Sequence, residues 1–149
     1  MPRITRTAAV VWEGNVARGS GAISAGSGAF GPLPFSLPTR VGQPEGKTSP
    51  EELLAAAHGG CFGMSLAGEL AGAGTPPTRI DLECEILMDE VEGRGHQIVG
   101  STIEATVVAD GVDDEALHAA VRTADEGCPF SALLKRAGAN VAIDARLAG

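Results

Sequence analysis

The three cysteines are the residues of this chain with the clearest chemical potential, because a thiol can act as a nucleophile, bind a metal or be oxidised. Cys84 lies in the stretch RIDLECEILMD, where apolar residues alternate with Asp and Glu. This alternation is typical of a half-buried β-strand, and it predicts that Cys84 faces the core as a small apolar side chain. The candidates for chemistry are therefore Cys61 and Cys128.

Cys61 and Cys128 have different sequence surroundings. Cys61 lies in a predicted helix that is dense in Ala and Gly, directly after Gly59-Gly60. Such small residues let a backbone or a ligand come close, but they also suit tight packing around an inert thiol. Cys128 precedes Pro129 in DEGCPFSALL, at a predicted helix N-cap. Helix N-termini favour a thiolate, although an ordinary turn cysteine also fits this position.

Local patterns predict the elements that position these thiols. Residues 28–47, with PLPFSLP and VGQPEG, are expected to be extended or looped rather than helical. Strands and helices segregate along the chain, which favours an α+β fold with a largely antiparallel sheet. No linker divides the chain, so we expect a single domain over residues 1–149. The predicted strands cover 4–13, 19–25, 78–90, 96–109 and 140–147, and the predicted helices cover 49–73, a segment capped by Asp113 or Asp114, and a short segment from Pro129.

Composition excludes several classes of partner. The 149 residues carry a formal net charge of −8, with Lys47 and Lys135 as the only lysines, which argues against nucleic acid. No apolar run has the length of a membrane span, and no leader opens the chain, so a cytoplasmic protein with no membrane partner is expected. Three cysteines in such a protein are not expected to form a structural disulfide framework.

Two sequence blocks, TSPEELLAAAHGGCFGMSL and the distant DEGCPFSALLK, together resemble the OsmC/Ohr family of organic hydroperoxide reductases, and specifically its OsmC branch. The segments VWEGNVARGSGAIS, SLPTR and TPPTRIDLECEI extend the resemblance over nearly the whole chain. It implies an intertwined homodimer whose sheets wrap paired central helices. It also implies reduction of organic hydroperoxides by a two-cysteine cycle in oxidative and osmotic stress defence, with no cofactor and with a lipoyl-type or other small dithiol as reductant.

The resemblance also assigns roles to individual residues. Cys61 matches the peroxidatic cysteine, Cys128 the resolving cysteine, and Glu51 the glutamate of the P-E motif. Arg40 in LPTR matches the catalytic arginine of the OsmC branch, and Arg18 is the alternative that aligns with the Ohr branch. A guanidinium beside the thiol would favour the thiolate and stabilise the leaving alkoxide, and a carboxylate would aim the guanidinium.

Helix geometry constrains how this site is assembled. Ten residues separate Glu51 from Cys61, which is about 15 Å along a continuous helix. Either the helix breaks near Gly59-Gly60, or the glutamate and the arginine approach from a partner subunit. The implied dimer favours the second explanation, with the glycines allowing close packing of the two chains beside the thiol. The expected apolar lining of the site is Phe62, Met64, Leu54 and Phe130.

Other functions fit the sequence less well. His58 is one turn before Cys61, but a cysteine hydrolase also needs an oriented carboxylate and an oxyanion hole, so His58 is predicted to pack or to support the site. His96 and His118 lie in a turn and on a helix surface, and no metal site is expected. A non-catalytic dimeric module that binds a small apolar ligand remains the alternative, although such a module has no use for the second thiol of Cys128.

Overall fold

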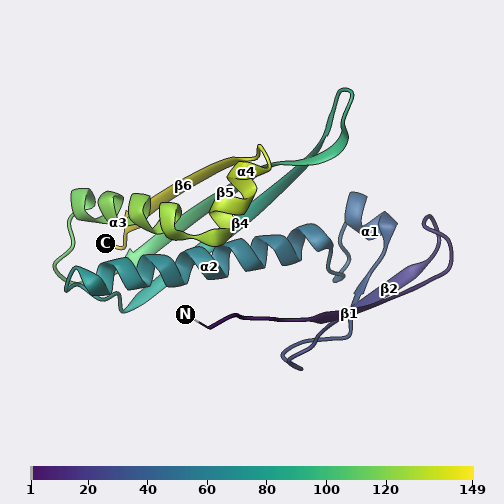
Figure 1. Ribbon diagram of the computed structural model, residues 1–149, viewed down its shortest axis with the longest axis horizontal. Helices are drawn as coiled ribbons and strands as arrows, with labels where there is room; N and C mark the ends of the chain where they lie inside the picture. Colours follow the sequence, from purple (N-terminus) through teal and green to yellow (C-terminus); the bar gives the residue numbers. More distant parts are fainter. Residues whose placement is uncertain (1) are drawn as a thin grey trace. The chain divides into compact units, whose positions relative to one another are not determined.

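Residues 2–149 are described by the computed structural model, and they form two units (Figure 1). The first unit ends at Pro50 and the second comprises Glu51–Gly149. No helix within the described residues is both long enough and apolar enough to cross a bilayer. That the whole chain forms a single domain remains a prediction.

The first unit contains a three-stranded antiparallel sheet of β1 (Ala8–Glu13), β2 (Ser20–Ala25) and β3 (Leu33–Phe35), in that order. The two strands predicted at 4–13 and 19–25 are confirmed, although β1 begins later than expected. Trp12 and Phe35 are in ring contact, with their centroids 5.5 Å apart. All six residues of β1 are exposed within this chain.

The expectation that residues 28–47 contain no helix is wrong. Residues Leu37–Val41 form the short helix α1. Its N-cap is Ser36, whose Oγ accepts a hydrogen bond from the backbone N–H of Thr39 at 3.4 Å, and Pro38 in the first turn needs no hydrogen-bond acceptor for its nitrogen. This proline-rich stretch therefore contains residues that start a helix as well as residues that interrupt one. The overall composition of the segment did not indicate the short helix.

The second unit confirms the remaining predicted elements to within a few residues. The long helix α2 (Pro50–Gly72) is followed by a hairpin of β4 (Arg79–Val91) and β5 (Gly95–Val108). Helix α3 (Asp114–Gly127) is capped by Asp113, one of the two predicted caps, and leads through α4 (Pro129–Arg136) to β6 (Asn140–Leu147). The Asp113 side chain accepts from the backbone N–H of Ala116 at 2.8 Å.

The sheet of the second unit is mixed, but the other strand pairings of the described residues are antiparallel, so the expectation of a largely antiparallel sheet is confirmed. Its order is β4-β5-β6, with β4 antiparallel and β6 parallel to the central strand β5. The parallel pairing follows from the connection, because α3 and α4 carry the chain back across the sheet before β6 begins.

The core of the second unit lies between β5 and the helices. Alternate residues of β5 are buried, from Ser101 to Val107, as expected for a strand with one face on a core. Both α2 and α3 contribute buried side chains to this same core. The buried side chains of the two helices are Phe62, Leu66 and Leu70 from α2, and Leu117, Val121 and Ala124 from α3.

Candidate active site

Cys61 and Cys128 are brought together in the second unit. Cys61 is half-buried in the middle of α2, and its thiol lies beside that of Cys128. Both thiols are free. Burial raises the pKa of Cys61, and the neighbouring Cys128 raises it further. Contacts with the backbone N–H of Phe130 and the hydroxyl of Ser65 act in the opposite direction.

Cys128 occupies the N-cap of α4, which confirms the position predicted from the sequence. Its side chain is fully buried, and Pro129 is the first residue of the helix. The Sγ of Cys128 accepts a hydrogen bond from the backbone N–H of Ser131 at 3.5 Å. The Cys128 backbone N–H in turn donates to the carbonyl of Asp125 in α3 at 3.3 Å. The end of α3 and the start of α4 therefore fix the backbone of this cysteine on both sides.

His58 is fully buried one turn before Cys61, in a hydrogen-bond network that sequence reasoning did not find. Its Nδ1 is 2.6 Å from Ser101 Oγ on β5, and its Nε2 is 2.7 Å from Ser131 Oγ on α4. Burial lowers the pKa of His58, with Lys135 acting in the same direction and Asp125 against it. A neutral imidazole has one donor and one acceptor nitrogen, so one serine donates to the ring and the other accepts from it.

This network supports the prediction that His58 has a packing or supporting role. Both ring nitrogens bond serines, and Cys84 lies 3.9 Å from Nδ1. The signal in the sequence was weak, because Ser101 and Ser131 are 43 and 73 residues from His58. A histidine on the apolar face of a helix was the only local sign that buried polar partners were needed.

Cys84 follows the predicted alternation but is half-buried rather than fully buried. Every second residue of β4 is partly buried over most of the strand, and Cys84 packs against the core. Its Sγ is 3.4 Å from Ser101 Oγ. Burial raises the pKa of this thiol, while Ser101 and the backbone of Gly59 act in the opposite direction. Burial, the largest of these effects, therefore favours the protonated, unreactive thiol that the sequence predicts for Cys84.

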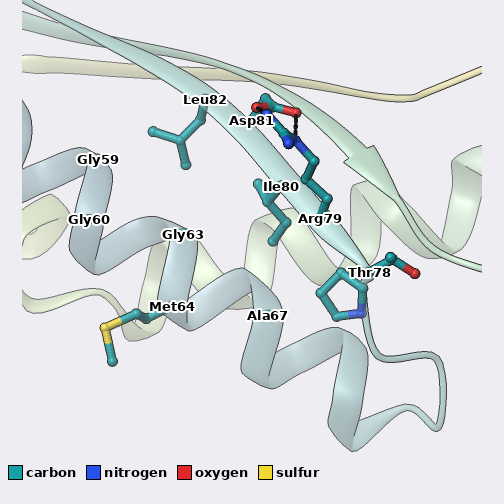
Figure 2. A pocket seen from close by; sticks show the side chains of 11 residues that line it. Gly59, Gly60, Gly63, Met64, Ala67, Thr78, Arg79, Ile80, Asp81 and Leu82 are labelled. Atoms are coloured by element: carbon teal, nitrogen blue, oxygen red, sulfur yellow. Dashed lines mark hydrogen bonds and ion pairs between the residues drawn. The ribbon is translucent and has the colours of Figure 1, made fainter.

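Helix α2 is continuous through Gly59 and Gly60, so a break of the helix, the less favoured of the two explanations, is excluded. A Cβ added to Gly59 would lie 2.9 Å from Leu82 Cδ1 and 3.3 Å from Cys84 Cβ. Figure 2 shows Leu82 of β4 above α2, close to Gly59 and Gly63. Gly59 therefore allows α2 to approach β4 within the chain, a reason that the sequence did not reveal.

Gly60 faces open space, because a Cβ placed there meets no atom within 4 Å. It lines an open groove of about 600 Å³ between α2 and the first half of β4 (Figure 2). Met64, one turn further along, points away from β4 and is 79% exposed in the chain. This surface, defined by Gly60, Gly63, Met64 and Ala67, is called the α2 groove below.

The apolar lining expected around Cys61 is wrong in part. Phe62 is fully buried among the core side chains, and Met64 belongs to the α2 groove. Adjacent helical positions point about 100° apart, so Phe62 cannot share the direction of its neighbour Cys61. Phe130 contacts Cys61 through its backbone N–H, and a lining of the site by the side chains of Phe130 and Leu54 remains a prediction.

The remaining predicted site residues lie in different parts of the chain. Arg40 is exposed in the last turn of α1, where it lines a cavity of about 210 Å³ with Trp12, Val16 and Phe35 among its neighbours. Arg18 is exposed before β2, and its backbone N–H donates to Asn15 Oδ1 at 2.9 Å. Both arginines belong to the first unit, so their approach to Cys61 remains a prediction.

Glu51 is partly buried in the first turn of α2. Because α2 is continuous, Glu51 lies about 15 Å along the axis from Cys61, too far for direct contact on one helix. Its predicted role in orienting the arginine remains untested. As for metals, no group of three His, Cys, Asp or Glu side chains within residues 2–149 is arranged to hold an ion.

The fold and the thiol pair define a class, namely α+β proteins in which a long helix and a helix N-cap present two neighbouring thiols. The profile described as OsmC-like protein matches residues 42–144. Peroxiredoxin OsmC of Escherichia coli (strain K12) is 36% identical over 136 residues, covering 91% of this chain and 92% of that protein. The chain belongs to the OsmC-like family, which confirms the resemblance seen in the sequence.

Solved structures agree with this assignment. The organic hydroperoxide resistance protein OhrB of Bacillus subtilis matches with a TM-score of 0.74 at 25% identity, covering 94% of this chain and 98% of that one. An OsmC-like protein of unknown function from Vibrio cholerae matches with a TM-score of 0.78 over 97% of this chain and 100% of that one, at 15% identity. The α+β OsmC-like fold is therefore confirmed.

Proposed function

We propose that this protein is a cysteine-based peroxidase that reduces organic hydroperoxides to alcohols, with Cys61 as the peroxidatic and Cys128 as the resolving cysteine. The observation that carries the proposal is the contact between these two thiols, which are 67 positions apart in the sequence. Similarity to a peroxiredoxin and to an organic hydroperoxide resistance protein supports the same activity. A family fold that only bound a ligand would not require a second thiol at this place.

The first step oxidises Cys61. Its thiolate attacks the distal peroxide oxygen, the O–O bond breaks, and the alkoxide takes up a proton to leave as the alcohol, while the cysteine becomes a sulfenic acid. Burial and the neighbouring thiol raise the pKa of Cys61, so another group must stabilise its thiolate. We propose Arg40, aimed by Glu51, as the cation that does this, with Arg18 as the alternative.

The second step closes the disulfide. The sulfur of Cys128 attacks the Sγ of Cys61, the S–O bond breaks, and the hydroxyl leaves as water with the proton of the Cys128 thiol. A small dithiol of the lipoyl type then reduces the disulfide by thiol exchange and is itself oxidised. Such a cycle fits a reducing compartment, and we place the protein in the cytoplasm.

One equivalent of cumene hydroperoxide should convert the reduced protein to a form with a Cys61–Cys128 disulfide and a reduced Cys84. The two thiols of the pair are neighbours, whereas Cys84 lies on β4, where burial favours its protonated thiol. Peptide mapping with thiol counting before and after the reaction measures this outcome. A dominant Cys61–Cys84 bridge would overturn the assignment of Cys128, and an unreacted Cys61 would favour the non-catalytic binding module.

Organic hydroperoxides should be better substrates than hydrogen peroxide. Arg40 lines a cavity with the apolar side chains of Trp12, Val16 and Phe35, which a hydrogen peroxide molecule cannot use for binding. Each buried CH₂ group contributes about 0.8 kcal/mol, so a few methylenes give a preference of tenfold or more. Steady-state kcat/KM for cumene hydroperoxide and hydrogen peroxide tests this, and equal values would contradict an apolar substrate site.

We further propose that the working form is an intertwined homodimer, as the resemblance implied. Strand β1 is exposed over its whole length, including Val10 and Val11 at 60% and 58%. The α2 groove likewise exposes Met64. Exposed apolar surface of this kind is typical of an interface, and a second copy of the chain is the partner that covers both surfaces.

A further inference from the structure

We infer that His58, through its hydrogen bond to Ser131, is a positioning residue that holds Cys128 at the distance from Cys61 required for the disulfide-forming step. The inference rests on the proposed peroxidase function and adds to it. It concerns only residues of the second unit, and it assigns no contact between His58 and the peroxide.

The first part of the argument is the path of bonds from His58 to Cys128. Nε2 of His58 is 2.7 Å from Ser131 Oγ. The backbone N–H of the same serine donates to Cys128 Sγ at 3.5 Å. Ser131 therefore contacts the histidine with its side chain and the resolving sulfur with its backbone. All three residues are fully buried, so water does not compete for these bonds.

The second part is the position of this connection relative to the two sulfurs. His58 precedes Cys61 by three residues on α2, or about 4.5 Å of axial rise, and Ser131 follows Cys128 by three residues at the start of α4. The His58–Ser131 bond thus joins α2 to α4 one turn away from the thiol pair. Loss of this bond would free the start of α4 to shift relative to α2, and with it the sulfur of Cys128.

The third part is that the other ring nitrogen provides a matched comparison. Nδ1 of His58 is 2.6 Å from Ser101 Oγ, and Ser101 is as fully buried as Ser131. Ser101 lies on β5, however, where its hydroxyl is also 3.4 Å from Cys84 Sγ. Replacing either serine by alanine removes one bond to the same imidazole. A purely structural role for the network predicts similar effects of the two changes, whereas positioning of Cys128 predicts different ones.

The experiment is a single-turnover reaction of the reduced full-length protein with one equivalent of cumene hydroperoxide, with and without dimedone to trap sulfenic acid. The rates of sulfenic acid formation at Cys61 and of disulfide formation are measured separately for the wild type, Ser131→Ala and Ser101→Ala. Formation of the sulfenic acid should stay within about twofold of the wild type in both variants. Disulfide formation should slow by about tenfold or more in Ser131→Ala alone, because small misplacements of reacting groups have large effects on rate.

Two more variants complete the test. Ser131→Thr keeps the hydroxyl and should restore disulfide formation, and His58→Gln removes the ring from between the serines and should slow it, which provides a second measurement if Ser131→Ala does not fold. Equal slowing in both alanine variants, or no slowing in Ser131→Ala, would overturn the positioning role. A wild-type Cys61 that does not react with the peroxide would instead overturn the proposed function.

Discussion

Replacement of Arg40 by alanine is expected to slow oxidation of Cys61 by cumene hydroperoxide by about a hundredfold to a thousandfold. Loss of one preorganised donor at a developing oxyanion costs about 2.7–4 kcal/mol in other enzymes, and the guanidinium is proposed to stabilise both the thiolate and the leaving alkoxide. Burial and the thiol of Cys128 already raise the pKa of Cys61, so the thiolate depends on such a cation. Single-turnover oxidation measured by thiol loss determines the rate.

The pH dependence of the same reaction gives an independent readout. If Arg40 favours the thiolate, Arg40→Ala leaves Cys61 with a higher pKa, and the rate should rise with pH over a higher range than in the wild type. Arg18→Ala is the matched control, since Arg18 is also an exposed arginine of the first unit. A large loss in Arg18→Ala together with a small loss in Arg40→Ala would transfer the catalytic role to Arg18.

Replacement of Gly60 by leucine is expected to dissociate the proposed dimer and lower peroxidase activity. Within one chain a Cβ at Gly60 meets nothing within 4 Å, so folding of the isolated chain should tolerate the change. Glycine inside a helix is also less favourable than alanine by about 1 kcal/mol. A lower helix propensity therefore cannot explain a loss of dimer or of activity in Gly60→Leu. A bulky side chain in a close contact between two copies would cost about 1–3 kcal/mol or more.

Gly59→Leu is the control, because the neighbouring glycine packs inside the chain. Its new side chain would meet Leu82 and Cys84, so it should lower the melting temperature. Light scattering, thermal unfolding and peroxidase assays on both variants separate the two effects. A wild-type protein that is a fully active monomer at assay concentration would refute the dimer, and an active dimeric Gly60→Leu protein would exclude the α2 groove as its interface.

Local sequence signals determined most of the elements and their ends. Proline at the start of α2, Asp113 before α3 and the Cys128-Pro129 pair at the start of α4 each satisfy or replace free N–H groups of the first turn. The alternation around Cys84 determined which face of β4 packs on the core. These signals act between residues a few positions apart, so they can be recognised in the sequence alone.

Only the tertiary structure determined which distant residues these elements bring into contact. Three features join segments that are far apart in the chain. They are the parallel pairing of β6, the approach of α2 to Leu82 at Gly59, and the bonds of His58 to two distant serines. The contact between Cys61 and Cys128 is of the same kind: the family motif implied their joint role, but only the packing of α4 against α2 placed one thiol beside the other. Such contacts depend on how buried surfaces of separate elements fit, which no local pattern encodes.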